Sequence, residues 1–159
     1  MNEVLAFLLE NRIVYLATVD GDIPKVRPIG FVMEFEGKLY FSTSNQKNVY
    51  KQLKANPNFE VSIISKTGDW LRLQGKAVFN TTRKTRQAAL DAVPAFSKMY
   101  SIDDVIFELF YIEDGEATFK RHKGIFQNRY IVIIFLLGLI RWLQSKIGDG
   151  RCNINAGAL

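Results

Sequence analysis

Alternation of apolar and polar residues is the main pattern in the first 120 positions, and it predicts β-strands. In the clearest run, at positions 70–79, Leu71 and Leu73 alternate with polar neighbours. This spacing gives a strand one apolar face and one largely polar face. Similar runs, rich in β-branched and aromatic residues, predict about seven strands at 13–20, 25–35, 38–42, 59–65, 70–79, 105–113 and 116–120.

Three segments with helical spacing of apolar residues interrupt these strands. They cover 2–10, 47–56 and 83–93, and 94–100 adds a further helical turn. The first three strands are separated only by short turns, so we expect them to form an antiparallel meander. Strands joined by hairpins rather than by crossover helices predict an antiparallel barrel. The fold class is therefore mainly β, with helices flanking the sheet (α+β).

The excess of positive over negative charge is confined to the end of the chain. Residues 1–120 contain fifteen Lys/Arg and fifteen Asp/Glu, whereas residues 121–159 contain six Lys/Arg and one Asp. The net charge of +5 therefore belongs to a basic, apolar tail, and it does not indicate nucleic-acid binding by the 1–120 domain. The first residues lack the basic region of a signal peptide, so we expect a cytoplasmic protein.

The tail has its own apolar segment, an uncharged run of eleven residues from Tyr130 to Ile140. A membrane span needs about 20 apolar residues, so this run is short. It suits a strand or helix packed on the barrel, or an interfacial membrane helix flanked by Arg129, Arg141 and Lys146. A third interpretation is a tail foreign to the domain, for example after a change of reading frame.

Cysteine and histidine are absent from the 1–120 domain. The only thiol is Cys152 and the only imidazole is His122. These counts exclude an intrachain disulfide and a Cys/His zinc cluster, and they exclude a Cys nucleophile or a His base in the domain. We expect no metal site. Any catalysis by this domain would depend on a bound cofactor.

The best candidate for a cofactor site is the segment at which a strand ends in hydroxyl side chains and a helix begins. Backbone N–H groups and the positive end of the helix dipole gather at such a point, which favours an anion. A lysine in the first helical turn opposes the dipole unless an anion lies beside it. The alternative is a capped helix with a solvated lysine. The candidate residues are Ser42, Thr43, Ser44, Gln46 and Lys47.

A second candidate is the run Arg27-Pro28-Ile29-Gly30. Pro28 marks an edge or bulge of its strand, because proline cannot donate to a ladder. Arg27 could contact a phosphate, and Gly30 would allow a close approach to the backbone. The alternative is a surface arginine.

The order of these features carries a family resemblance. Arg27-Pro28-Ile29 is followed by Tyr40-Phe41-Ser42-Thr43, by Lys47 at a helix start, by Asn56-Pro57, and by a strand beginning at Trp70. Residues 1–120 thus resemble the pyridoxamine 5′-phosphate oxidase-like, FMN-binding split-barrel superfamily, especially small bacterial members near the nitroimidazole-resistance group.

This resemblance implies a six-stranded antiparallel split β-barrel and a homodimer with FMN at the interface. It implies that Arg27 and Lys47 bind the FMN phosphate with help from the hydroxyls of the 42–44 segment. It also implies that residues 28–30 follow the isoalloxazine edge and that Trp70 approaches the flavin. The implied activity is FMN-dependent redox chemistry on an unidentified small molecule. The alternatives are a non-catalytic module that binds flavin, or a deazaflavin or haem ligand.

Overall fold

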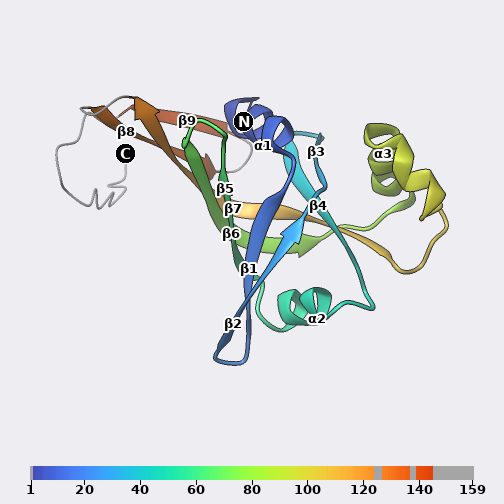
Figure 1. The fold of residues 1–159 in the computed structure, drawn as a ribbon. Helices are drawn as coiled ribbons and strands as arrows, with labels where there is room; N and C mark the ends of the chain where they lie inside the picture. The colour runs from blue at the N-terminus through green and yellow to red at the C-terminus, as the bar shows by residue number, and fades with distance from the viewer. Residues whose placement is uncertain (1, 124–126, 137–138, 145–159) are drawn as a thin grey trace.

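The structure is a computed structural model that describes residues 2–123, 127–136 and 139–144, with side chains for residues 3–121. Helices flank one long, curled antiparallel sheet (Figure 1). The elements in chain order are α1 (Asn2–Asn11), β1 (Val14–Asp20), β2 (Ile23–Ile29), β3 (Val32–Phe35), β4 (Lys38–Ser44), α2 (Asn48–Ala55), β5 (Asn58–Ile64), β6 (Trp70–Phe79), α3 (Arg83–Ala92), the 3-10 helix η1 (Pro94–Lys98), β7 (Phe107–Lys123), β8 (Gln127–Leu136) and β9 (Leu139–Gln144).

The strand order β2-β1-β5-β6-β7-β4-β3 makes the sheet a split barrel. All neighbours in this order pair antiparallel. The two end strands, β2 and β3, are consecutive in the chain, with only Gly30 and Phe31 between them. Because the three Cα–Cα links from Ile29 to Val32 span at most about 11 Å, the sheet must curl until its ends lie close together. The mainly β fold class is thus confirmed.

Two details of the predicted sheet are corrected by this order. The run 25–35 is not one strand: β2 pairs with β1 and β3 pairs with β4, so the expected three-strand meander does not form. The barrel also has seven strands along its path rather than six, and it is not closed between β2 and β3. The break leaves one edge of β2 open.

A β-bulge explains why β7 is longer than predicted. The sequence predicts a turn at Asp114-Gly115, yet β7 continues through these two residues and is 17 residues long in all. Asp114 takes a φ of 50°, and the pairing with β6 shifts register beside Gly75. A Cβ at Gly75 would lie 2.6 Å from Ile112 Cγ1 and 2.7 Å from the Glu113 carbonyl oxygen. The absent side chain of Gly75 therefore makes room for the bulge.

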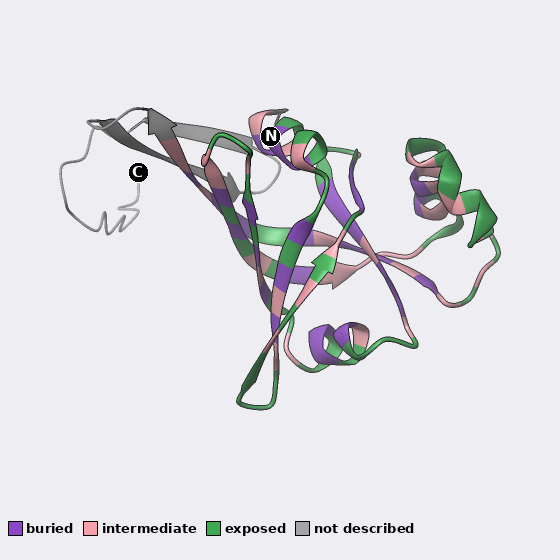
Figure 2. Ribbon diagram, viewed as in Figure 1, coloured by how far each residue is buried: buried purple, intermediate pink, exposed green. Residues whose placement is uncertain are grey.

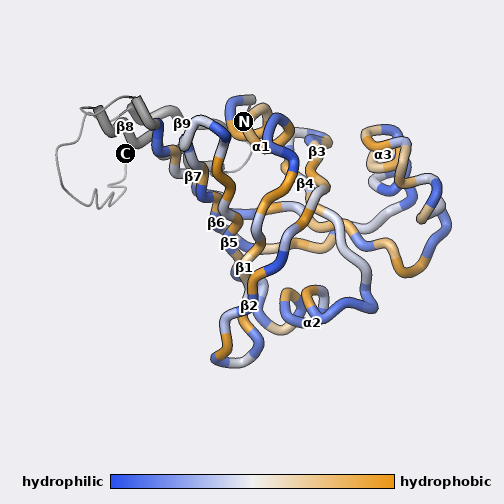
Figure 3. Tube along the Cα trace, viewed as in Figure 1, coloured by the Kyte–Doolittle hydropathy of each residue, from blue (hydrophilic) through white to orange (hydrophobic). Residues whose placement is uncertain are grey.

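Two apolar clusters lie on opposite faces of β4. The larger fills the barrel and includes stacked Phe41 and Phe110, whose ring centroids are 5.6 Å apart. The smaller lies beneath α3 and η1 and contains Tyr40 and Phe107. Burial accordingly alternates along the strands and is confined to the inner faces of the helices (Figure 2). The hydropathy of the chain follows the same alternation (Figure 3).

Helix α2 positions the candidate site. Val49, Gln52 and Leu53 form its buried face, at the i, i+3, i+4 spacing of an amphipathic helix. The helix contacts both β1 and β4. The helix therefore bridges β1 and β4, the strands next to the two end strands β2 and β3 of the split sheet.

The start of the tail continues the sheet. β7 runs past residue 120 to Lys123, β8 pairs with its last part, and β9 pairs with β8. Most of the run 130–140 is therefore strand, rather than an interfacial helix. Cys152 and Lys146 lie outside the described residues. Among the helices that are described, none is long and apolar enough to cross a membrane.

Candidate functional site

Arg27 lies on the inner face of the edge strand β2. It stands opposite Leu16 of β1, and opposite residues of an antiparallel pair share a face. Its guanidinium turns along β1 toward α2: Nη1 donates to Thr18 Oγ1 (2.5 Å) and to the Leu16 carbonyl (3.4 Å), and Nη2 donates to Gln52 Oε1 (2.7 Å). A strand residue is thereby fixed beside the helix that follows β4.

These bonds leave the charge of Arg27 without a counterion. A guanidinium has five N–H donors. Three are used, so the Nε donor and one Nη2 donor have no partner among the described side chains. No described carboxylate forms an ion pair with Arg27. Partial burial lowers the pKa of the Arg27 guanidinium from its ordinary value. Such a cation, with spare donors, favours an anionic partner.

Thr18 and Gln52 hold this arginine, and the sequence analysis missed both. Thr18 donates to Gln52 Oε1 (2.7 Å), while Gln52 Nε2 donates to Asp20 Oδ2 (3.2 Å). Thr18 and Gln52 are buried, with 4% and 6% of their surface exposed. A glutamine on the apolar face of a predicted helix was the available sign, because buried polar groups require partners.

The loop 45–47 connects β4 to the N-terminus of α2. Lys47 is its N-cap residue and makes no side-chain capping bond. The loop is anchored from Asn45, whose backbone N–H donates to the Ile106 carbonyl (3.1 Å) and whose Nδ2 donates to the Val105 carbonyl (2.7 Å). Since lysine has no side-chain acceptor to offer, it does not cap the first turn of α2. The Tyr50 amide donates to the Lys47 carbonyl (3.1 Å), and the two helix amides before it remain suited to an anion.

The hydroxyls before this loop differ in their surroundings. Ser44 is buried, and its Oγ accepts a bond from the Gln46 amide (3.3 Å). Thr43 is also buried, yet its Oγ1 is without a hydrogen-bond partner, the one such side-chain atom found among the described residues. Ser42 is half-buried and Gln46 is exposed. An orphaned hydroxyl costs about 1–3 kcal/mol in desolvation, so Thr43 is a candidate for a ligand contact.

The open edge of β2 continues from Arg27 into Pro28, Ile29 and Gly30. Gly30 has no positive φ, and a Cβ built on it meets nothing within 4 Å. Neither the backbone nor the packing of this chain therefore requires a glycine here. The position leaves space for a group to approach the strand edge.

Trp70 is not brought to this site within one chain. It begins β6, opposite Ile64 of β5. Three strand spacings separate β6 from β2, or roughly 14 Å along the sheet. Trp70 also shares the outer face with Ile64, whereas Arg27 points inward.

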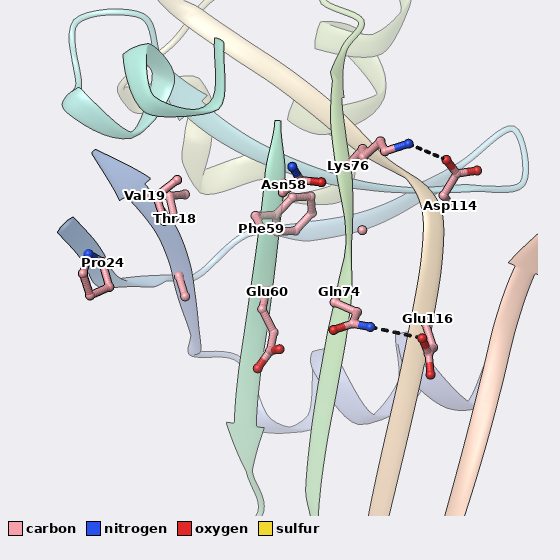
Figure 4. Close-up of a pocket in the computed structure, with 12 residues that line it drawn as sticks. Thr18, Val19, Pro24, Asn58, Phe59, Glu60, Gln74, Lys76, Asp114 and Glu116 are labelled. Atoms are coloured by element: carbon pink, nitrogen blue, oxygen red, sulfur yellow. Dashed lines mark hydrogen bonds and ion pairs between the residues drawn. The ribbon is translucent and has the colours of Figure 1, made fainter. Parts of the chain in front are cut away.

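A cavity of about 470 Å³ lies on the outer face of the sheet, across β1, β5, β6 and β7 (Figure 4). Its polar side chains already have partners, including Lys76 with Asp114 (3.1 Å) and Gln74 with Glu116 (3.1 Å). Arg27 and Lys47 do not line it. The described carboxylates form no group able to hold a metal ion. The site formed by Arg27 and the N-terminus of α2 at Lys47 is therefore the better candidate for binding an anion.

Comparisons with known proteins place these features in a family. The family model described as Pyridoxamine 5'-phosphate oxidase matches residues 1–119. No curated protein matches the chain. A solved structure of a NimC/NimA family protein from Clostridium acetobutylicum is 43% identical, with a TM-score of 0.77; the match covers 83% of this chain and 91% of that one.

Two more distant structures share the fold. One is a pyridoxamine 5'-phosphate oxidase-related, FMN binding protein from Nostoc punctiforme, at 16% identity and a TM-score of 0.67 over 93% of this chain and 96% of that one. The other is general stress protein 26 from Bacillus anthracis, at 19% identity and a TM-score of 0.61 over 74% and 91%. The family match, the relative at 43% identity and the split sheet agree: the chain belongs to the pyridoxamine 5'-phosphate oxidase family.

Proposed function

We propose that this chain is a cytoplasmic, homodimeric FMN-binding protein that carries out redox chemistry on a small molecule. The observation that carries the proposal is the part-buried Arg27 guanidinium beside the helix that Lys47 caps. Among the described residues it keeps two donors without a partner and has no counterion. Family membership and the relationship to an FMN binding protein of the same fold support the choice of ligand.

The residues present suit the phosphate of FMN. A phosphate dianion would be balanced by one arginine and one lysine, and it would accept from the first-turn amides of α2. The orphaned Thr43 hydroxyl supplies one more donor. Gln52, which holds Arg27, lies five residues after Lys47, so the backbone positions of Lys47 and Gln52 are about 7.5 Å apart along the helix axis. We assign the phosphate to Arg27, Lys47 and Thr43, with Ser42, Ser44 and Gln46 shaping the loop.

The flavin would supply the hydride or electron transfer when bound. The role of this chain is then to bind and orient. Residues 1–120 contain no thiol or imidazole for acid–base or nucleophilic steps. The strand edge at Pro28, Ile29 and Gly30 would lie along the ring system, because Gly30 leaves its backbone accessible. The phosphate site would fix the distance of the ring from the substrate.

A second copy of the chain would complete the site. The outer face of the sheet exposes Tyr15, Val26 and Ile64, each with more than half of its surface accessible. Register places these three residues and Trp70 on the same face of adjacent strands. Apolar surface of this kind is typical of an interface. Trp70 from the partner could then meet the flavin that Arg27 holds, which would account for their separation within one chain.

Redox activity is tested on FMN-loaded protein under anaerobic conditions. The flavin is reduced with dithionite or NAD(P)H, and its absorbance is followed as candidate organic acceptors are added. We expect at least one acceptor to reoxidise the bound flavin faster than it reoxidises free reduced FMN. Reoxidation no faster than that of free FMN with every acceptor would contradict the catalytic part and favour a flavin-binding module.

A further inference from the structure

We propose that Gln52 is a positioning residue that holds Arg27 ready for a phosphate and thereby makes the site selective for phosphorylated flavin. This inference rests on the proposed function, since it concerns the same site. It assigns Gln52 no contact with the ligand. Gln52 acts only through the guanidinium that its Oε1 accepts from at 2.7 Å.

The orientation of the Gln52 amide is fixed by its neighbours. Oε1 accepts from Arg27 and from Thr18 Oγ1, and Nε2 donates to Asp20. A flipped amide would turn its N–H groups toward the arginine donors and its oxygen toward the Asp20 carboxylate. Both new contacts would be repulsive. The amide therefore has one favourable state, and Arg27 meets an acceptor at a fixed point.

Thr18 holds Arg27 from the side of the sheet, and together with Gln52 it forms a cradle for the guanidinium. Its hydroxyl accepts from Arg27 Nη1 (2.5 Å) while it donates to Gln52 Oε1 (2.7 Å). Arg27 is thus held by Thr18 and the Leu16 carbonyl of β1 and by Gln52 of α2, and these two elements contact each other. A free arginine side chain samples many rotamers, so fixing it beforehand lowers the entropic cost of ligand binding.

The cradle also decides which donors remain free. Gln52 and Thr18 are neutral, so they orient the guanidinium without cancelling its charge. Thr18 and the Leu16 carbonyl occupy the two donors of Nη1, and Gln52 occupies one donor of Nη2, which leaves the Nε donor and the other Nη2 donor. Two donors from one guanidinium can bind a phosphate in parallel. A glutamate at position 52 would instead form an ion pair and remove the anion site.

The test compares the affinities of FMN and riboflavin, which differ in the phosphate. Each is titrated into wild type, Gln52→Leu and Gln52→Glu with flavin fluorescence as the readout. We expect wild type to favour FMN. We expect the FMN-to-riboflavin affinity ratio to fall about tenfold in Gln52→Leu and further in Gln52→Glu, while riboflavin affinity changes less than about twofold.

Two further variants keep the test interpretable if a buried substitution disturbs folding. Asp20→Ala removes, at an exposed position, the acceptor that holds the Nε2 end of the Gln52 amide, and we expect a smaller fall in the same ratio. Gln87→Leu is the matched control, because Gln87 is an exposed glutamine on α3, and we expect no change.

The outcomes separate the inference from the proposed function. If wild type binds no FMN, the proposed function is overturned. If wild type favours FMN and the Gln52 variants keep its full affinity ratio, Gln52 has no positioning role and only the inference fails. A parallel loss of both flavins would show a structural role instead and would equally overturn the inference.

Discussion

Replacement of Arg27 by alanine tests the proposed phosphate site by removing a single side chain. The variant removes the part-buried cation and both of its free donors, but Thr18 can still donate to Gln52. The polar cluster therefore keeps a hydrogen bond inside the protein. We expect the chain to fold and the affinity for FMN to fall.

The magnitude follows from the bonds that are lost. Hydrogen bonds to charged groups contribute about 1.5–3 kcal/mol, which corresponds to roughly 10- to 150-fold in Kd. Arg27 is only partly buried, so we expect a result toward the lower end of this range. Arg27→Lys keeps the charge and loses the paired donors, and its affinity should lie between those of wild type and alanine.

The assay is a titration of FMN monitored by flavin fluorescence, with circular dichroism to confirm folding. Arg83→Ala is the matched control: it removes the same charge from α3, where Arg83 forms an exposed ion pair with Asp103. The control should bind FMN as wild type does. A folded Arg27→Ala protein with unchanged FMN affinity would refute the assignment of this arginine to the phosphate.

Four further substitutions give contrasting outcomes. Lys47→Ala should weaken FMN by about 1.5–3 kcal/mol in the same titration without lowering thermal stability, and unchanged binding would remove Lys47 from the site. Thr43→Val should raise the free energy of unfolding by about 1 kcal/mol in urea, because it removes an orphaned hydroxyl, yet it should weaken FMN; a loss of stability would contradict this. Gly75→Ala should lower stability by about 1–3 kcal/mol in urea, since its Cβ would clash with β7, whereas Gly30→Ala should leave stability unchanged and weaken flavin binding; equal stability of the two variants would refute this contrast.

Local patterns predicted most of the strands but only some of their partners. Alternation located β6 at its observed bounds, and the turn at Gly21, with a φ of 60°, formed the expected hairpin between β1 and β2. The break after β2 was missed because residues 25–35 are suited to a strand throughout. Because the sheet curls, β3 pairs with β4 rather than extending β2. The bulge at Asp114 was mistaken for a turn for a similar reason. The residue that makes room for the bulge, Gly75, lies on another strand.

The candidate site was predicted in part. The sequence indicated Arg27 and Lys47 through proline, glycine and helix-start patterns, which are local. Thr18 and Gln52 are 34 residues apart and meet only after α2 packs against β1. No local spacing could pair them. The orphaned Thr43 hydroxyl likewise became evident only from its burial and lack of a partner.

Binding of FMN by the purified protein tests the central claim most directly. Apo protein is titrated with FMN by isothermal calorimetry, and its mass in solution is measured with and without ligand. We predict one FMN per chain and a mass of two chains. A protein that binds no FMN at any concentration used would contradict the account.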